Sequence, residues 1–161
     1  MKFQQIWQGR LLSTDGKQPL TPFFPAEVPG NIQYDWAVHE GFAHQIMFDT
    51  TSRRFLDVED NFWEYRTTLS YDLSEGHRLF FVAEGIDYRF DILLDGKLLC
   101  THEGMYTPIE LDITEFAHGE SELNVRIYPH PKLPGEFATP REMAAPDVPT
   151  PMSSMEDESL I

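Results

Sequence analysis

Apolar and polar side chains alternate at every second position along several stretches of this chain. Trp63, Tyr65 and Leu69 fall on one side of an extended segment, with Glu64 and Arg66 on the other. The same period recurs in three later segments, which are residues 88–95, 109–113 and 123–127. Because successive side chains of a strand point to opposite faces of a sheet, this pattern predicts strands that each bury one face.

Two further stretches have the character of strands. Residues 4–13 give an opening strand through Ile6 and Leu12. Residues 79–83 are continuously apolar, which is typical of a strand covered on both faces. Together with the alternating segments, these runs predict a chain built mainly of β-strands.

The connections carry turn-forming residues. Asp95-Gly96 separates two apolar runs and predicts a tight hairpin, since a type I′ turn needs a positive φ at both central residues. Residues 74–76 and 118–120 each contain a glycine and predict weaker turns.

One short helix is expected over residues 32–39, with Asn31 as its N-cap and Gly41 as its C-terminal stop. Many short strands, one short helix and frequent turns favour an all-β fold, an antiparallel β-sandwich. Nothing alternates as β-α-β, which argues against a nucleotide-binding doubly wound sheet.

The composition changes after Tyr128. Seven of the twelve prolines fall in residues 129–161, and proline removes a backbone donor and interrupts helices and central strands. We therefore expect a folded body over residues 1–128, followed by an irregular, acidic, proline-rich tail over residues 129–161.

The charge balance excludes two classes of partner. Twelve Lys and Arg against 27 Asp and Glu give a formal charge of −15, which opposes binding to nucleic acid and to anionic membranes. The one cysteine, Cys100, cannot form an intrachain disulfide, and no secretory leader is visible after Met1. We expect a cytoplasmic protein, or a periplasmic or secreted one if a leader was removed.

Three stretches, taken together, resemble a known family. They are Val28-Pro29-Gly30-Asn31-Ile32, the aromatic-rich residues 60–69, and a long run over residues 85–114 that includes Asp95-Gly96 and Gly104-Met105-Tyr106-Thr107-Pro108. In order and spacing they are similar to the N-terminal sugar-binding domain of glycoside hydrolase family 2, the group of β-galactosidases, β-glucuronidases and β-mannosidases. The strand Trp63-Glu64-Tyr65-Arg66 leans toward the β-mannosidase-like branch.

This resemblance implies a jelly-roll β-sandwich of the galactose-binding-like type over about residues 4–128. It also implies an accessory domain, because the family's catalytic glutamates lie in a barrel of about 250 residues, more than this chain holds. The implied partners are carbohydrate and the downstream domains of a parent hydrolase. The Gly-Trp-Asp-Trp-Gly stretch that reaches the active site in β-mannosidase-like members is absent after Tyr128.

Asp87, Arg89 and Asp91 form the first candidate site for sugar binding. An arginine flanked by carboxylates is suited to orienting sugar hydroxyls. However, the three residues alternate with Tyr88 and Phe90, which also explains them as the solvent side of a strand, and Asp87 also suits a turn cap. We favour the structural interpretation.

His102, Glu103 and Tyr106 form a second candidate, on a loop expected at the rim of the sandwich, where function usually resides. The alternative is that this loop serves only as a fixed turn. Trp36 is the tryptophan that we expect to be exposed and able to stack on a sugar, whereas Trp63 is expected in the core.

No metal site, cofactor or nucleophile is predicted. The six histidines lack metal-binding spacing, and the acidic residues 57–60 resemble a solvated loop more than a calcium site. Cys100 reads as a small core residue, and no Gly-x-Ser-x-Gly motif occurs.

The prediction is thus a non-catalytic accessory domain that supports a catalytic barrel and its substrate cleft. Two alternatives stay open. One is a free-standing carbohydrate-binding module that uses Trp36, His102 and Tyr106. The other is a structural assembly domain that forms a homodimer through an unpaired sheet edge.

Overall fold

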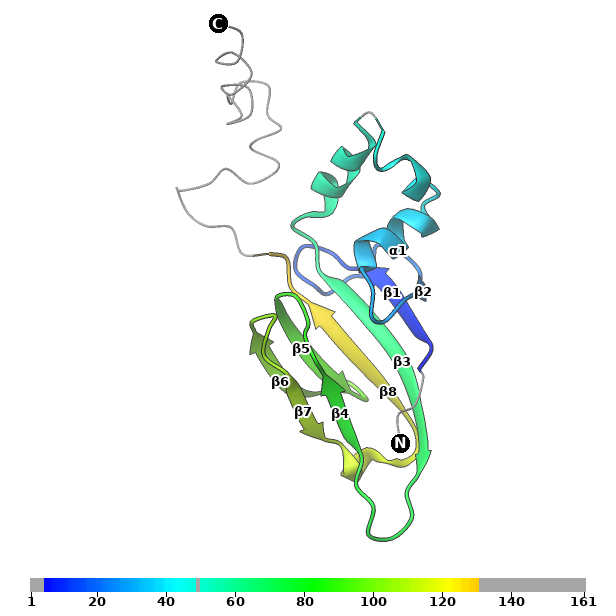
Figure 1. Cartoon of the computed structure of the whole chain (residues 1–161), viewed down its shortest axis with the longest axis vertical. Coiled ribbons are helices and arrows are strands. Elements are labelled where there is room, and N and C mark those ends of the chain that lie inside the picture. The colour runs from blue at the N-terminus through cyan, green and yellow to red at the C-terminus, as the bar shows by residue number, and fades with distance from the viewer. Residues whose placement is uncertain (1–4, 49, 131–161) are drawn as a thin grey trace, which may run out of the picture. The chain divides into compact units, whose positions relative to one another are not determined.

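A computed structural model describes residues 5–48 and 50–130 of the chain (Figure 1). Within these ranges antiparallel strands predominate. The elements in chain order are β1 (Trp7–Leu11), β2 (Phe24–Ala26), α1 (Ile32–His39), the 3-10 helices η1 (Ala43–Gln45) and η2 (Thr51–Val58), β3 (Trp63–Asp72), β4 (Phe80–Ala83), β5 (Arg89–Leu94), β6 (Lys97–Glu103), β7 (Ile109–Asp112), the 3-10 helix η3 (Thr114–Phe116) and β8 (His118–Ile127). The predicted all-β sandwich with one short α-helix is confirmed. The expected tail lies outside the described residues, except for Pro129 and His130.

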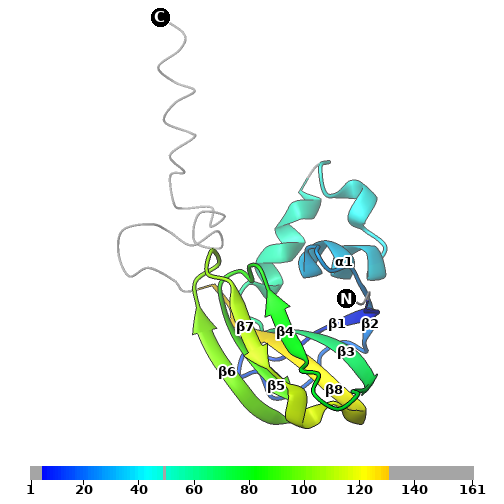
Figure 2. The same cartoon turned by 60° about the horizontal axis from the view of Figure 1, so that its bottom comes forward.

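Six strands form the larger sheet, in the order β2-β1-β3-β8-β5-β6, and β4 pairs with β7 in a second sheet. Each pairing is antiparallel. The longest runs through β3 and β8, from Trp63 opposite Ile127 to Asp72 opposite His118. In Figure 2, β4 and β7 form a layer in front of the larger sheet, and α1 lies above β1 and β2.

Two groups of buried side chains make up the core. The first joins α1, through Ile32, Trp36 and Ala37, to the inner face of β1 and β3, including Trp63. The second lies between the two sheets and consists of Leu69, Phe90, Ile92, Leu94, Ile109, Ile113, Leu123 and Val125. Trp63 and Leu69 are an even number of residues apart on β3, so their side chains point to the same face of the sheet. Trp63 belongs to the first group and Leu69 to the second, so helices cover one end of this face and the small sheet covers the other end.

The helix α1 begins and ends where the sequence predicts. The Asn31 side chain accepts a hydrogen bond from the backbone N–H of Tyr34, at 3.1 Å. Gly41 has a φ of +78°, and the N–H groups of Gly41 and Phe42 donate to the carbonyls of Val38 and Ala37. This pair of bonds is the Schellman motif, which satisfies carbonyls left free at a helix end.

Asp95-Gly96 forms the predicted hairpin between β5 and β6, with φ values of +50° and +76°. The predicted turn at residues 118–120 is wrong, because these residues already pair with β3 as the start of β8. The chain reverses direction before residue 118, in the 3-10 helix η3 between β7 and β8.

The prediction that residues 79–83 are covered on both faces is also wrong. Phe81 and Ala83 of β4 are half-buried, whereas Phe80 and Val82 are 39% and 56% exposed. The small sheet packs only one face on the core, so these two apolar side chains point outward. Arg78 pairs with Asp112 on the neighbouring strand, and its guanidinium lies over the Phe80 ring.

Candidate functional site

The larger sheet brings most of the predicted sugar-binding residues to one rim. Arg89, which begins β5, lies opposite Glu103, which ends β6, and the loop with Tyr106 follows. Asp87, Arg89 and Glu103 are exposed, and Tyr106 is 87% exposed. Side chains that are far apart in the sequence are therefore available together to solvent at this edge.

Asp91 differs from the candidate residues Asp87 and Arg89, because it is only 9% exposed. Its carboxylate accepts hydrogen bonds from the hydroxyls of Thr101, at 2.7 Å, and Tyr128, at 2.9 Å. The interpretation of Asp91 as a solvent-facing residue is therefore wrong. Asp91 does alternate with Phe90, but the side chains of Thr101 on β6 and of Tyr128 after β8 contact its carboxylate on the outer face of the sheet.

Tyr128 completes the rim, although no sequence signal singled it out. Its ring lies 4.6 Å from the guanidinium carbon of Arg89 and 4.7 Å from the centroid of Phe62. Burial raises the pKa of its phenol, and the hydrogen bond to Asp91 raises that pKa further. The rings of Tyr88 and His130 pack close by in a tilted arrangement, with centroids 5.7 Å apart. Tyr88 directly precedes β5 and His130 lies three residues after the end of β8, so the positions of both residues in the chain link them to the rim.

His102 lies on the inner side of β6, opposite Phe90, and the two ring centroids are 5.6 Å apart. Its Nε2 atom is buried and has no hydrogen-bond partner among the described residues. This position favours a packing role. A role of His102 in sugar binding stays a prediction.

The prediction that Trp36 is exposed is wrong, since its side chain is 7% exposed. It packs edge-on against Trp63, Phe42 and Phe55, with centroid distances of 5.8, 5.3 and 5.9 Å. The reason is the orientation of α1 about its axis, which points the Trp36 side chain toward the sheet. Trp63 lies in the core as predicted, at 5% exposed.

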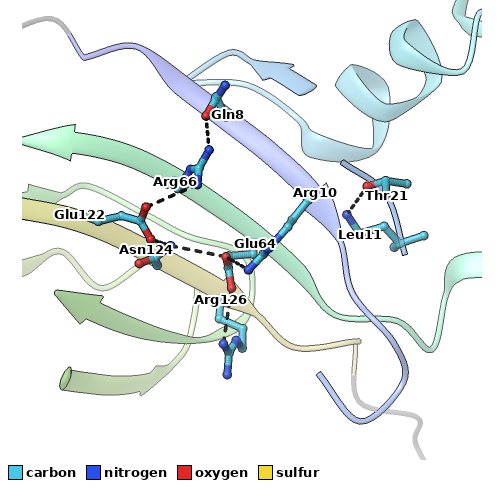
Figure 3. A network of polar contacts seen from close by, with 9 residues as sticks. All are labelled: Gln8, Arg10, Leu11, Thr21, Glu64, Arg66, Glu122, Asn124 and Arg126. Carbon is cyan, nitrogen blue, oxygen red and sulfur yellow. Dashed lines mark hydrogen bonds and ion pairs between the residues drawn. The ribbon is translucent and has the colours of Figure 1, made fainter. Parts of the chain in front are cut away.

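A polar network occupies the outer face of the larger sheet (Figure 3). At its centre is Glu64 of β3, whose side chain is 2% exposed. Its carboxylate accepts hydrogen bonds from Arg10 of β1, at 2.7 Å, and from Arg126 and Asn124 of β8, both at 3.4 Å. These bonds fasten the middle strand to both of its neighbours.

The network extends in two directions. Arg66 donates to Gln8, at 2.7 Å, and to Glu122, at 3.4 Å. Phe23 lies over the network, because its ring centroid is 3.5 Å from the guanidinium carbon of Arg66 and 4.3 Å from that of Arg10.

Arg126 also lies opposite Asp91 in the register of β8 and β5. A polar row therefore crosses the sheet from Arg10 to the rim. The sequence pattern had placed Glu64 on a polar face but gave no sign of its burial.

The described residues contain no group of three or more His, Cys, Asp or Glu side chains arranged to hold a metal ion. Within residues 5–48 and 50–130, no helix combines the length and the apolar character needed to cross a membrane.

Comparison with known proteins agrees with this architecture. A family profile described as glycosyl hydrolase 2 galactose-binding domain-like matches residues 7–154. No curated protein sequence matches the chain.

Solved structures share the fold. The β-D-mannosidase of Dictyoglomus thermophilum superposes with a TM-score of 0.64 at 21% identity, over 80% of this chain and 16% of that one. A β-glucuronidase of Faecalibacterium prausnitzii gives a TM-score of 0.61 at 16% identity, over 100% of this chain and 27% of that one. The chain thus spans less than a third of the length of either protein. On the match over residues 7–154, the chain belongs to the glycosyl hydrolase 2 galactose-binding domain-like family.

Proposed function

We propose that this domain serves, without cleaving glycosides itself, as an accessory part of a larger family 2 glycoside hydrolase, where it supports a catalytic domain and its substrate cleft. The observation that supports this role is the small share of each similar glycosidase that this chain spans. Both glycosidases carry most of their residues outside the segment that this chain resembles, since it spans 16% and 27% of their lengths.

The chemistry of the most buried carboxylate among the described residues agrees with a structural role. A retaining glycosidase needs two carboxylates about 5–5.5 Å apart across the scissile bond, one as nucleophile and one as proton donor. Glu64 is instead bonded to Arg10 and Arg126, and it holds β3 to its neighbours.

The test has two parts. The DNA that follows the codon for Ile161 is sequenced, and the purified chain is assayed against aryl β-mannosides, β-galactosides and β-glucuronides. We expect a reading frame that continues into a barrel domain, and no cleavage by the chain alone. Cleavage by the chain, or a gene that encodes no barrel, contradicts the proposal.

The rim supports a second candidate, a carbohydrate-binding module. Tyr106 offers an exposed ring, and Arg89 and Glu103, which are exposed at the paired ends of β5 and β6 before this loop, offer a donor and an acceptor. Isothermal titration with mannosides and galactosides tests this role. The module is supported if the chain binds a sugar, Tyr106→Ala abolishes the binding, and the control Tyr34→Ala leaves it unchanged. No measurable heat of binding would count against the module.

The edge strands support a third candidate, self-assembly. β6 ends the larger sheet on one side, and Leu98 on this strand is 54% exposed. An edge strand presents backbone groups that pair readily with a strand of another chain. Light scattering across a range of concentrations should then detect a dimer, and a monomer at the highest concentration would remove this candidate.

A further inference from the structure

The strands at the edges of the larger sheet carry features that discourage pairing with another chain. Among the described residues, β2 and β6 are the outer strands of this sheet. β2 contains Pro25, which has no backbone N–H to donate. The register of β5 and β6 shifts between Ile92 and Leu93, so β6 carries a β-bulge. Proline and bulges are devices by which edge strands avoid recruiting further strands.

The strand β4, which lies beside β7 in Figure 2, carries neither device. Its residues Phe80–Ala83 are apolar and pair with β7 without a break. Just before them, the backbone N–H of Ile113 donates to the carbonyl of Leu79, at 2.9 Å. Residues of an antiparallel strand bond alternately to one neighbouring strand and to the other, so the odd-numbered residues of β4 bond to β7. The backbone groups of Phe80 and Val82 therefore face the other edge, where no described strand pairs with β4.

The side chains along this edge are complementary to a reversed copy of themselves. Residues 78–84 alternate between exposed and half-buried, with Phe80 and Val82 exposed in the middle. Arg78 is exposed on one side of this pair, and Glu84 is exposed on the other. Arg78 already pairs with a carboxylate on β7, but a guanidinium has five N–H donors and can serve a second acceptor. Glu84 takes part in none of the ion pairs found among the described residues.

The free edge of β7 is unsuited to the same kind of pairing. If two copies of β7 paired antiparallel about Leu111, Glu110 of each copy would lie opposite Asp112 of the other. Like charges directly opposite each other on neighbouring strands are destabilising. Of the edge strands among the described residues, β4 is therefore the one whose backbone and side chains both suit a second copy.

We propose that a second copy of this chain associates through β4, with the two β4 strands paired antiparallel about Phe81. This register places Phe80 opposite Val82 of the copy and Arg78 opposite Glu84 of the copy, and the two-fold symmetry repeats both contacts. Aromatic with β-branched pairs and opposite charges are the cross-strand pairs that stabilise a sheet. The inference rests on the self-assembly candidate, moves its contact from β6 to β4, and does not depend on the accessory role.

Sedimentation equilibrium of the 161-residue chain, from micromolar to millimolar concentration, measures the association. Val82→Pro removes a backbone N–H that faces the free edge and leaves the bonds between β4 and β7 in place. It should lower the association constant by at least about tenfold, because the symmetric dimer loses two hydrogen bonds. Val82→Thr keeps the N–H and the branched shape, and should keep most of the association. Leu98→Ser, on the edge strand of the larger sheet, should have no effect.

Two charge reversals test the register. Arg78→Glu and Glu84→Arg each place like charges opposite each other at both ends of the paired strands. Either change alone should therefore weaken the dimer by about tenfold. When the two variants are mixed in equal amounts, they should form a heterodimer about as readily as the unchanged chain associates, because every charge then meets its opposite. Pairing about any other residue of β4 does not bring these two positions together and predicts no such recovery.

The outcomes separate this inference from the candidate on which it rests. A chain that stays monomeric at the highest concentration overturns both. A dimer that survives Val82→Pro, or a mixture of the charge variants that does not recover, overturns this inference alone and leaves self-assembly standing. Slow hydrogen exchange at the Phe80 and Val82 amides of a monomer would identify a segment of the same chain as the occupant of the edge, and would also overturn it.

Discussion

Glu64 allows a direct test of how the larger sheet is held together. Its side chain is 2% exposed, and groups from the strands on both sides bond to its carboxylate. The change Glu64→Ala removes the carboxylate and leaves the guanidinium groups of Arg10 and Arg126 near each other without their shared counter-charge.

The expected cost follows from the burial of the three side chains. Breaking a buried ion pair by removing one partner costs about 3–5 kcal/mol. The side chains of Arg10 and Arg126 are 26% and 32% exposed, so water screens part of the repulsion, and we expect a loss of about 3 kcal/mol. For a folded body of this size, that loss lowers the midpoint of thermal unfolding by about 10 °C.

Urea and thermal unfolding of the whole chain, followed by circular dichroism, measure this loss. Glu122→Ala is the matched control, because it removes a glutamate on the same face whose side chain is 49% exposed, and it should cost about 0.5 kcal/mol. The triple change Arg10→Met, Glu64→Leu and Arg126→Met should recover most of the stability, since apolar replacements of a whole buried ion group are often neutral. A loss below about 1 kcal/mol for Glu64→Ala would refute the reasoning.

Three further predictions address separate parts of the structure. Gly85→Ala should cost about 1–3 kcal/mol in thermal unfolding, because a Cβ at Gly85 would lie 2.6 Å from the carbonyl oxygen of Met105; an unchanged midpoint would show that the loop yields freely. Asn31→Ala should cost about 1 kcal/mol through loss of the helix cap, and Asn31→Asp much less, so equal losses would contradict capping. The side-chain and backbone bonds from Thr114, and then Arg78, lower the pKa of Asp112 to about 2. Its contribution to stability is therefore present above about pH 4 and lost as the pH falls toward 2. Thr114→Val should raise this pKa toward 3.8 in an NMR titration, and an unmoved value would rule out Thr114 as the main cause.

The features that the sequence predicts well are those that depend on near neighbours in the chain. The helix has the bounds expected from Asn31 and Gly41, because both caps act within one turn. The hairpin at Asp95-Gly96 forms because its φ values suit those two residue types. By contrast, β2 spans three residues and includes Pro25, so it has no alternation to detect.

The features that could not be predicted from the sequence depend on which side chains cover a face of a sheet. Alternation assigns Glu64 and Asp91 to the polar side of their strands, but their burial comes from Phe23, Tyr128 and the arginines that lie over that side. The outer face of the small sheet shows the same dependence, because Phe80 and Val82 are apolar but stay exposed there, with the Arg78 guanidinium over the Phe80 ring. The candidate site could thus be placed at the rim but not resolved into exposed and buried members.

The two core groups meet mainly at Tyr65 and Ile127, which are only partly buried and pack against both. Structural units that share few contacts open independently, each with its own free energy. The helices α1, η1 and η2 should therefore open and close without disrupting the sandwich, and amide hydrogen exchange should divide into two cooperative sets. Exchange in α1 would be the faster, while the paired amides of β3, β8 and β5 would exchange only when the whole body unfolds.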